Sequence, residues 1–98
     1  MPAFPFTWDP RKAKQNLAKH RVSFEEASTV FYDEQALEME DPDEVSGEDR
    51  FVMIGLSANL RLLAVCHCVR GVGNVIRIIS ARRAVKAEQN QYRERLSR

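Results

Sequence analysis

Three arginines within the seven residues from Arg77 to Arg83 are the side chains in this sequence best suited to chemistry. The stretch 76–84 predicts a buried strand, then Ser80 as a helix cap, with Arg82 and Arg83 in the first helical turn. Cations there oppose the helix dipole, at a cost of roughly 0.3–1 kcal/mol each, whereas the free N–H groups of a helix start bind anions. The pattern therefore predicts a phosphate site; the alternative is that Arg82 and Arg83 point into solvent.

Charge is distributed very unevenly along the chain, although the net charge is only +1. Residues 1–49 contain five Lys and Arg against twelve Asp and Glu, whereas residues 50–98 contain ten against two. This asymmetry favours a basic surface that binds nucleic acid or an acidic partner.

Length and composition indicate an ordinary small globular protein. Ninety-eight residues, 44% of them hydrophobic, suit one domain spanning 1–98 with a single modest core. No apolar run approaches the roughly 18 residues that cross a membrane, and the sequence shows no signal-peptide pattern, so we expect a cytoplasmic protein.

The two cysteines do not predict a disulfide or a metal site. Cys66 and Cys68 are two residues apart in a strand-like run, where their side chains share a face about 6.6 Å apart along the strand. His67 faces the other way on such a strand, and no second ligand pair is present. We therefore expect small buried residues, and no metal or other cofactor.

The segments that must position these side chains predict an α+β fold. Asp9 with Pro10 begins one helix, and Ser23 with Glu26 forms a capping box for the next. The expected elements are a strand at 4–8, a helix at 10–19, a helix from 24 that breaks at 33, strands at 36–39, 50–56, 60–69 and 75–79, and a helix at 81–96, with loops at 41–47 and 71–74. This β-α-α-β-β-β-β-α order predicts helices packed on an antiparallel sheet.

Glu88 is the exception in the apolar stripe of the closing helix, which also contains Tyr92. A carboxylate that faces a sheet needs a cationic partner, and Arg77 or Arg50 is the expected one.

The sequence closely resembles the BrnT family of ribonuclease toxins from about Phe6 to Tyr92. The motifs that carry the resemblance are, in order, Phe6-Thr7-Trp8-Asp9, Lys12-Ala13, Asn16, Lys19-His20, Val22-Ser23-Phe24, Ala27, Val30-Phe31, Asp33, Gly47-Glu48, Arg50, Gly55, and Arg77-Ile78-Ile79-Ser80-Ala81-Arg82 with Glu88 and Tyr92. Arg21 replaces a glycine that is usual in the family, so the turn after the first helix is not expected to need a left-handed residue.

The resemblance implies a RelE-like fold, a metal-independent ribonuclease that slows translation, and a hetero-oligomer with a cognate DNA-binding antitoxin similar to BrnA. RNA cleavage without a metal requires a base for the 2′-hydroxyl proton, an acid for the leaving 5′-oxygen, and cations for the phosphate.

His67 and His20 are the candidates for proton transfer, with a core position and a helix C-terminal cap as their structural alternatives. We favour Arg77 and Arg82 as phosphate contacts. Glu88 is expected to orient an arginine or to act as a base. The remaining expected substrate contacts are Arg50, Arg83, Lys12, Lys19 and Tyr92.

The alternative function is a non-catalytic module whose basic half binds nucleic acid or an acidic protein, with salt-dependent binding and no turnover. A metal-dependent hydrolase is poorly supported, because no His or carboxylate pair has ligand spacing.

Overall fold

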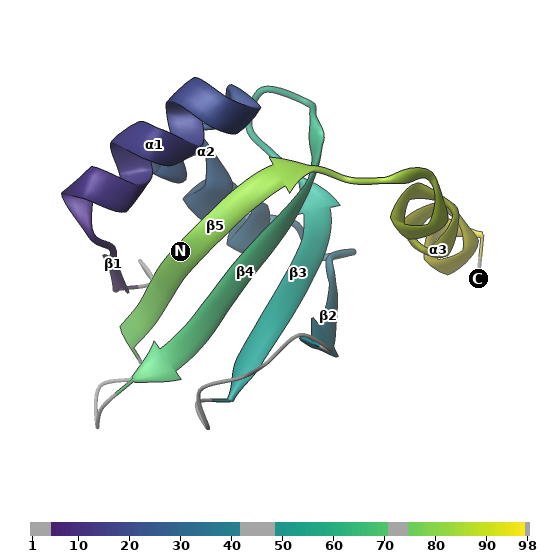
Figure 1. The fold of residues 1–98 in the computed structure, drawn as a ribbon. Helices are drawn as coiled ribbons and strands as arrows, with labels where there is room; N and C mark the ends of the chain where they lie inside the picture. The colour runs from purple at the N-terminus through teal and green to yellow at the C-terminus, as the bar shows by residue number, and fades with distance from the viewer. Residues whose placement is uncertain (1–4, 42–48, 71–74, 98) are drawn as a thin grey trace.

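The computed structural model describes residues 5–41, 49–70 and 75–97 (Figure 1). The elements in these ranges are β1 (Phe6–Thr7), α1 (Pro10–His20), α2 (Phe24–Thr29), the 3-10 helix η1 (Val30–Tyr32), β2 (Leu37–Glu40), β3 (Arg50–Leu56), β4 (Leu62–Arg70), β5 (Val75–Arg83) and α3 (Lys86–Leu96). Phe4, residues 42–47 of one expected loop and the expected loop at 71–74 lie outside the described residues. No helix in the described ranges is both long and apolar enough to cross a membrane.

The five strands form one mixed sheet in the order β1-β5-β4-β3-β2. Neighbouring strands from β2 to β5 are antiparallel, but β1 is parallel to β5, with Phe6 opposite Ile76 and Thr7 opposite Arg77. The expectation of a purely antiparallel sheet was therefore wrong. Parallel pairing needs a long connection, and most of the chain separates these two strands.

The two faces of the sheet pack against different helices. On one face, Leu63 and Val65 of β4 pack with Phe24 and Ala27 of α2 in the larger core. On the opposite face, Ala64 packs with Ile54 and with Tyr92 of α3. Successive strand residues alternate between faces, so the register assigns every β4 side chain to either the α2 side or the α3 side.

Both predicted helix starts in the first half are confirmed. Asp9 accepts a hydrogen bond from the backbone N of Arg11 (2.9 Å), and Pro10 is the first residue of α1. Ser23 Oγ accepts from the backbone N of Glu26 (3.0 Å), but the Glu26 carboxylate bonds Ser57 and Arg61, so only the Ser23 half of the predicted capping box forms. The turn between the helices differs from expectation: Arg21 has φ 59° and ψ 31°, a left-handed conformation that favours glycine.

The end of β5 corrects the main prediction about the arginines. The ladder with β4 continues to Arg83, which lies opposite Leu63, and α3 begins only at Lys86. Ser80 therefore lies within a strand and caps no helix, and Arg82 and Arg83 are not in a first helical turn. The chain continues its backbone pairing with β4 at the residues where the local sequence pattern predicts a helix start. The backbone N of Val85 instead donates to Glu88 Oε1 (2.9 Å).

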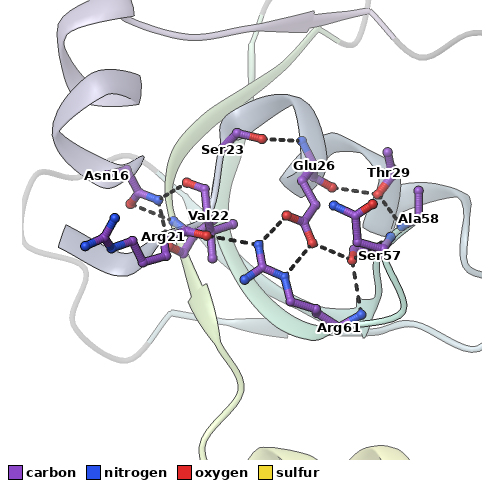
Figure 2. Close-up of polar contacts among 11 residues, drawn as sticks. Asn16, Arg21, Val22, Ser23, Glu26, Thr29, Ser57, Ala58 and Arg61 are labelled. Atoms are coloured by element: carbon purple, nitrogen blue, oxygen red, sulfur yellow. Dashed lines mark hydrogen bonds and ion pairs between the residues drawn. The ribbon is translucent and has the colours of Figure 1, made fainter. Parts of the chain in front are cut away.

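Glu26 links α2 to the turn between β3 and β4 (Figure 2). One carboxylate oxygen accepts from Ser57 Oγ (2.7 Å) and Arg61 Nε (2.8 Å), and the other pairs with Arg61 Nη2. Arg61 Nη2 also donates to the carbonyl of Arg21 (3.0 Å). The guanidinium of Arg61 is the main reason that the pKa of Glu26 is lowered to about 2. This network holds the α1–α2 turn against the sheet.

Candidate active site

Three arginines lie on the α3 side of the sheet because of the strand register. Arg50 of β3 and Arg77 of β5 both lie opposite Cys68 of β4, and Arg82 lies opposite Ala64. Three rows of paired residues cross β3, β4 and β5 in that order. The first row is Arg50, Cys68 and Arg77, the second is Val52, Cys66 and Ser80, and the third is Ile54, Ala64 and Arg82. With strands about 4.8 Å apart, the Cα atoms of Arg50 and Arg77 are separated by roughly 10 Å. We call the surface made by Arg50, Cys66, Arg77, Ser80 and Arg82 the arginine face.

A bulge in β5 is what puts Arg77 and Arg82 on the same face. The pairing shifts between Cys66, opposite Ser80, and His67, opposite Ile78, so Ile79 is an extra residue in β5. Strict alternation would turn two side chains five residues apart to opposite faces. One extra residue restores a common face, and β-bulges are over-represented next to active sites for this reason.

Glu88 holds Arg82 from the first turn of α3. Its two carboxylate oxygens accept from Arg82 Nη1 (2.8 Å) and Nη2 (3.0 Å), a bidentate ion pair. The hydrogen bond from Arg82 is the main cause that lowers the pKa of Glu88. The predicted cationic partner was Arg77 or Arg50, so this assignment was wrong, although the prediction that Glu88 needs an arginine is confirmed. The Arg82 side chain is still 42% exposed, which leaves it accessible to a ligand.

Cys66 lies at the centre of the arginine face. Its thiol donates to Asp41 Oδ2 (3.4 Å), just beyond the end of β2. Burial, followed by the contact with Asp41, raises the pKa of Cys66 to about 11. Cys66 is therefore a neutral thiol at physiological pH. The prediction of small buried residues is confirmed for Cys68 but not for Cys66, which is partly exposed, and neither cysteine forms a disulfide.

A groove between α1 and β5 adjoins this face at Ser80. It encloses about 260 Å³. Its lining residues are Lys12, Gln15, Asn16, Lys19, His20, Ile79 and Ser80. Lys12, Lys19 and His20 thus share one side of α1, as their helical spacing predicts.

Asn16 holds α1, one wall of the groove, against β5, the other wall. Its side-chain amide bonds to the backbone of β5 as a neighbouring strand would. Its Nδ2 donates to the carbonyl of Ala81 (2.8 Å), and its Oδ1 accepts from the N of Ala81 (3.1 Å). Nδ2 also donates to the carbonyl of Val22 (2.9 Å). The amide thereby satisfies backbone groups that a neighbouring strand would otherwise bond, and it joins α1 to β5.

His67 lies away from the arginines, on the α2 side of the sheet. It is 1% exposed. Its Nε2 contacts Glu38 Oε1 (3.0 Å), its Nδ1 contacts the carbonyl of Val65 (3.1 Å), and its ring meets Phe31 edge-on at a centroid distance of 4.7 Å. This is the structural alternative considered for His67, and the structure does not bring the side chain to the proposed phosphate site.

Tyr92 and Arg83 are also separate from the arginine face. Tyr92 is 7% exposed, and its hydroxyl donates to Asp33 Oδ2 (2.6 Å), so its ring is part of the core rather than a surface for stacking bases. Arg83 lies opposite Leu63, whose side chain faces α2, and it lines a shallow pocket with Arg61.

Sequence reasoning missed Asp41 and the side chain of Ser80. Asp41 begins an acidic loop in the sequence, and nothing local indicates contact with Cys66, which is 25 residues away. Ser80 resembled a helix cap. Only the strand order and the bulge place both beside the arginines. Among the described residues, no group of three or more His, Cys, Asp or Glu side chains is arranged to hold a metal ion.

Comparison with known proteins agrees with the resemblance noted from the motifs. Residues 8–88 match the family model described as the ribonuclease toxin BrnT of a type II toxin–antitoxin system. This chain belongs to the BrnT family. The crystal structure of the Brucella abortus ribonuclease toxin BrnT has a similar fold, with a TM-score of 0.64 and 23% sequence identity over 86% of this chain and 100% of that one. No curated protein sequence matches the chain significantly.

Membership of the BrnT family sets the class of function. The family consists of ribonuclease toxins, and a toxin of a type II system has a protein antitoxin as its partner. The arginine face and the α1–β5 groove are the cationic surfaces on which this chemistry can be assigned to residues.

Proposed function

We propose that this chain is the toxin of a toxin–antitoxin pair, a single RelE-like domain that cleaves RNA without a metal ion and thereby inhibits translation in the cytoplasm. Family membership supports the ribonuclease class. The observation that carries the assignment of the site is the placement of Arg50, Arg77 and Arg82 on one face of the sheet.

The arginine face binds the scissile phosphate. A guanidinium group stays protonated at physiological pH and donates two parallel hydrogen bonds to a phosphate. Negative charge grows on the phosphate oxygens as the 2′-oxygen attacks, so cations fixed beforehand stabilise the transition state more than the ground state. Glu88 orients Arg82 for this task through the bidentate pair.

The α1–β5 groove binds the adjoining RNA backbone. Lys12 and Lys19 supply charge for phosphates on either side of the cleaved bond. His20 is the last residue of α1 and lines the same groove. Ser80 belongs both to the lining of this groove and to the arginine face, and for this reason we assign His20 as the acid that protonates the leaving 5′-oxygen.

The partner is a DNA-binding antitoxin similar to BrnA. Covering the arginine face with acidic side chains would neutralise the cations and exclude RNA, which accounts for inhibition by complex formation.

The decisive test is incubation of the folded, antitoxin-free protein with a defined RNA in excess EDTA. We expect fragments that end in a 2′,3′-cyclic phosphate or a 3′-phosphate, since these ends follow from attack by the 2′-oxygen. Intact RNA would refute the ribonuclease assignment, and salt-dependent binding of that RNA without cleavage would favour the non-catalytic module instead. Cleavage that stops in EDTA would refute metal independence alone.

A further inference from the structure

β2 forms one edge of the sheet, and no strand in the described ranges pairs with its outer side (Figure 1). The backbone N of Asp41 donates to the carbonyl of Arg50 (2.9 Å), so these two residues form a hydrogen-bonded pair of the antiparallel ladder. Such pairs alternate with pairs that exchange no hydrogen bonds. Counting back along β2, the backbone N–H and C=O groups of Glu38 and Glu40 therefore point away from β3. An edge of this kind can accept an added strand.

The α3 side of this edge is apolar. Leu37 and Met39 point to that side and pack at the margin of the smaller core, where both are only partly buried. A groove of about 260 Å³ lies between these two side chains and α3, and its helix wall consists of Gln91, Glu94 and Arg95. Every second side chain of an added strand would point to this side. The groove therefore offers a place for apolar side chains of such a strand.

The α2 side of the same edge is acidic. Glu38 and Glu40 alternate with the apolar pair, and Glu38 Oε1 contacts His67 Nε2 on the α2 side (3.0 Å). The Glu38 side chain is nonetheless 49% exposed, and Glu40 is also exposed. The remaining side chains of an added strand would lie directly beside these two carboxylates. Because opposite charges across neighbouring strands attract and like charges repel, this side of the edge favours a strand with basic residues.

We infer that the outer edge of β2 binds an extended segment of a partner protein in which basic and large apolar side chains alternate. The backbone of this segment bonds the outward groups of Glu38 and Glu40, and its basic side chains pair with the two carboxylates. Its apolar side chains enter the groove beside Leu37 and Met39. A second copy of this chain does not fit, because matching the apolar sides of two β2 strands would set their glutamates against each other. The inference goes beyond the proposed function and does not depend on RNA cleavage.

The test follows the binding of synthetic octapeptides to the isotope-labelled full chain by NMR. The probe alternates lysine with valine. One control peptide alternates glutamate with valine, and the other has the composition of the probe with all lysines before all valines. We expect only the probe, at millimolar concentration, to shift the amide signals of residues 37–40 and to slow the solvent exchange of the N–H groups of Glu38 and Glu40. Equal shifts with either control peptide would overturn the inference, as would a probe that leaves the β2 signals unchanged.

Two substitutions of Glu40 separate the charge from the backbone contact. Glu40→Gln removes one carboxylate but keeps the N–H group, so we expect the Kd of the probe to rise about two- to fivefold. Glu40→Pro also removes the outward N–H, at a position where an edge strand tolerates proline. Its Kd should rise about tenfold or more. Wild-type affinity in Glu40→Pro would contradict strand addition, and self-association of the wild type that Glu40→Pro abolishes would make a second copy the occupant.

Two N-methylated forms of the probe repeat the backbone test without changing the protein. One carries the methyl groups on every lysine nitrogen and the other on every valine nitrogen. Only alternate N–H groups of an added strand face β2, so we expect one form to bind like the probe and the other to lose binding. Equal binding of both forms would overturn the inference.

Discussion

Arg77 and Arg82 are five residues apart in β5, yet both side chains point to the α3 side of the sheet, because the extra residue Ile79 shifts the alternation by one. Without the bulge, one arginine would face the core beneath α2. The fold therefore assembles the arginine face, our proposed phosphate site, through an irregularity in a strand, and this face depends on the register of β5 against β4.

Replacing either arginine should reduce catalysis without unfolding the protein. We expect Arg77→Ala and Arg82→Ala each to lower kcat/KM for a defined RNA by about 10²–10³-fold, the usual effect of losing one contact to transition-state charge. Arg83→Ala is the matched control, because Arg83 is the neighbouring cation on the opposite side of the strand. An equal loss in all three variants, at unchanged melting temperature, would contradict the arginine face and indicate a diffuse charge effect.

Glu88→Gln should weaken cleavage by a smaller factor than Arg82→Ala. The glutamine keeps an oxygen to which the N–H of Val85 can donate, so the start of α3 is preserved. It loses one half of the bidentate pair, leaving Arg82 less well oriented. We expect a loss of about tenfold in kcat, equivalent to roughly 1.4 kcal/mol. Steady-state kinetics with a melting curve will check this, and a wild-type kcat would show that Arg82 needs no orientation.

The sequence predicted most elements of this fold because local signals determined them. Asp9 with Pro10 and Ser23 with Glu26 indicated the correct helix starts, and the apolar runs indicated β3 and β4. The helix predicted to begin after Ile79 was wrong. Ser80 resembles a helix cap in the sequence, whereas the pairing of this segment with β4 cannot be recognised from neighbouring residues. Residues brought together by strand order, above all Asp41 and Cys66, could not be found from sequence periodicity.

Tyr92→Phe should reduce stability and leave cleavage unchanged. The hydroxyl donates to Asp33, which also receives hydrogen bonds from the backbone N of Leu56 (2.8 Å) and Gln35 (2.9 Å). Two donors therefore remain, and the cost should be about 1–2 kcal/mol. Urea unfolding measures the stability and the RNA assay measures the rate. A large fall in kcat with little change in stability would instead give the hydroxyl a part in the reaction.

The two thiols should resist alkylation in the native protein. Only the thiolate reacts, and burial together with Asp41 raises the pKa of Cys66 to about 11, while Cys68 is 2% exposed. We expect negligible modification by iodoacetamide at pH 8 in buffer over a period in which both cysteines react in denaturant. Cys66→Ser and Cys68→Ser identify the reacting residue. Rapid labelling of Cys66 in the folded protein would show that its contact with Asp41 opens in solution.

Glu26→Gln should destabilise the protein at neutral pH, and the difference from the wild type should shrink in acid. The pKa of Glu26 is lowered from 4.5 to about 2 in the folded state, mainly by Arg61, and its side chain is only 7% exposed. A lowered pKa stabilises the fold above the unfolded value of 4.5, and this contribution is lost as the pH falls toward 2. The size of this contribution to the free energy of unfolding at pH 7 is on the order of 2–3 kcal/mol.

Urea unfolding at pH 7 and pH 3 should show the difference in stability between Glu26→Gln and the wild type falling by about half. The control Glu25→Gln, at an exposed neighbour in α2, should match the wild type at both pH values. A difference that is the same at the two pH values would show that the charge of Glu26 does not hold the α1–α2 turn to the sheet.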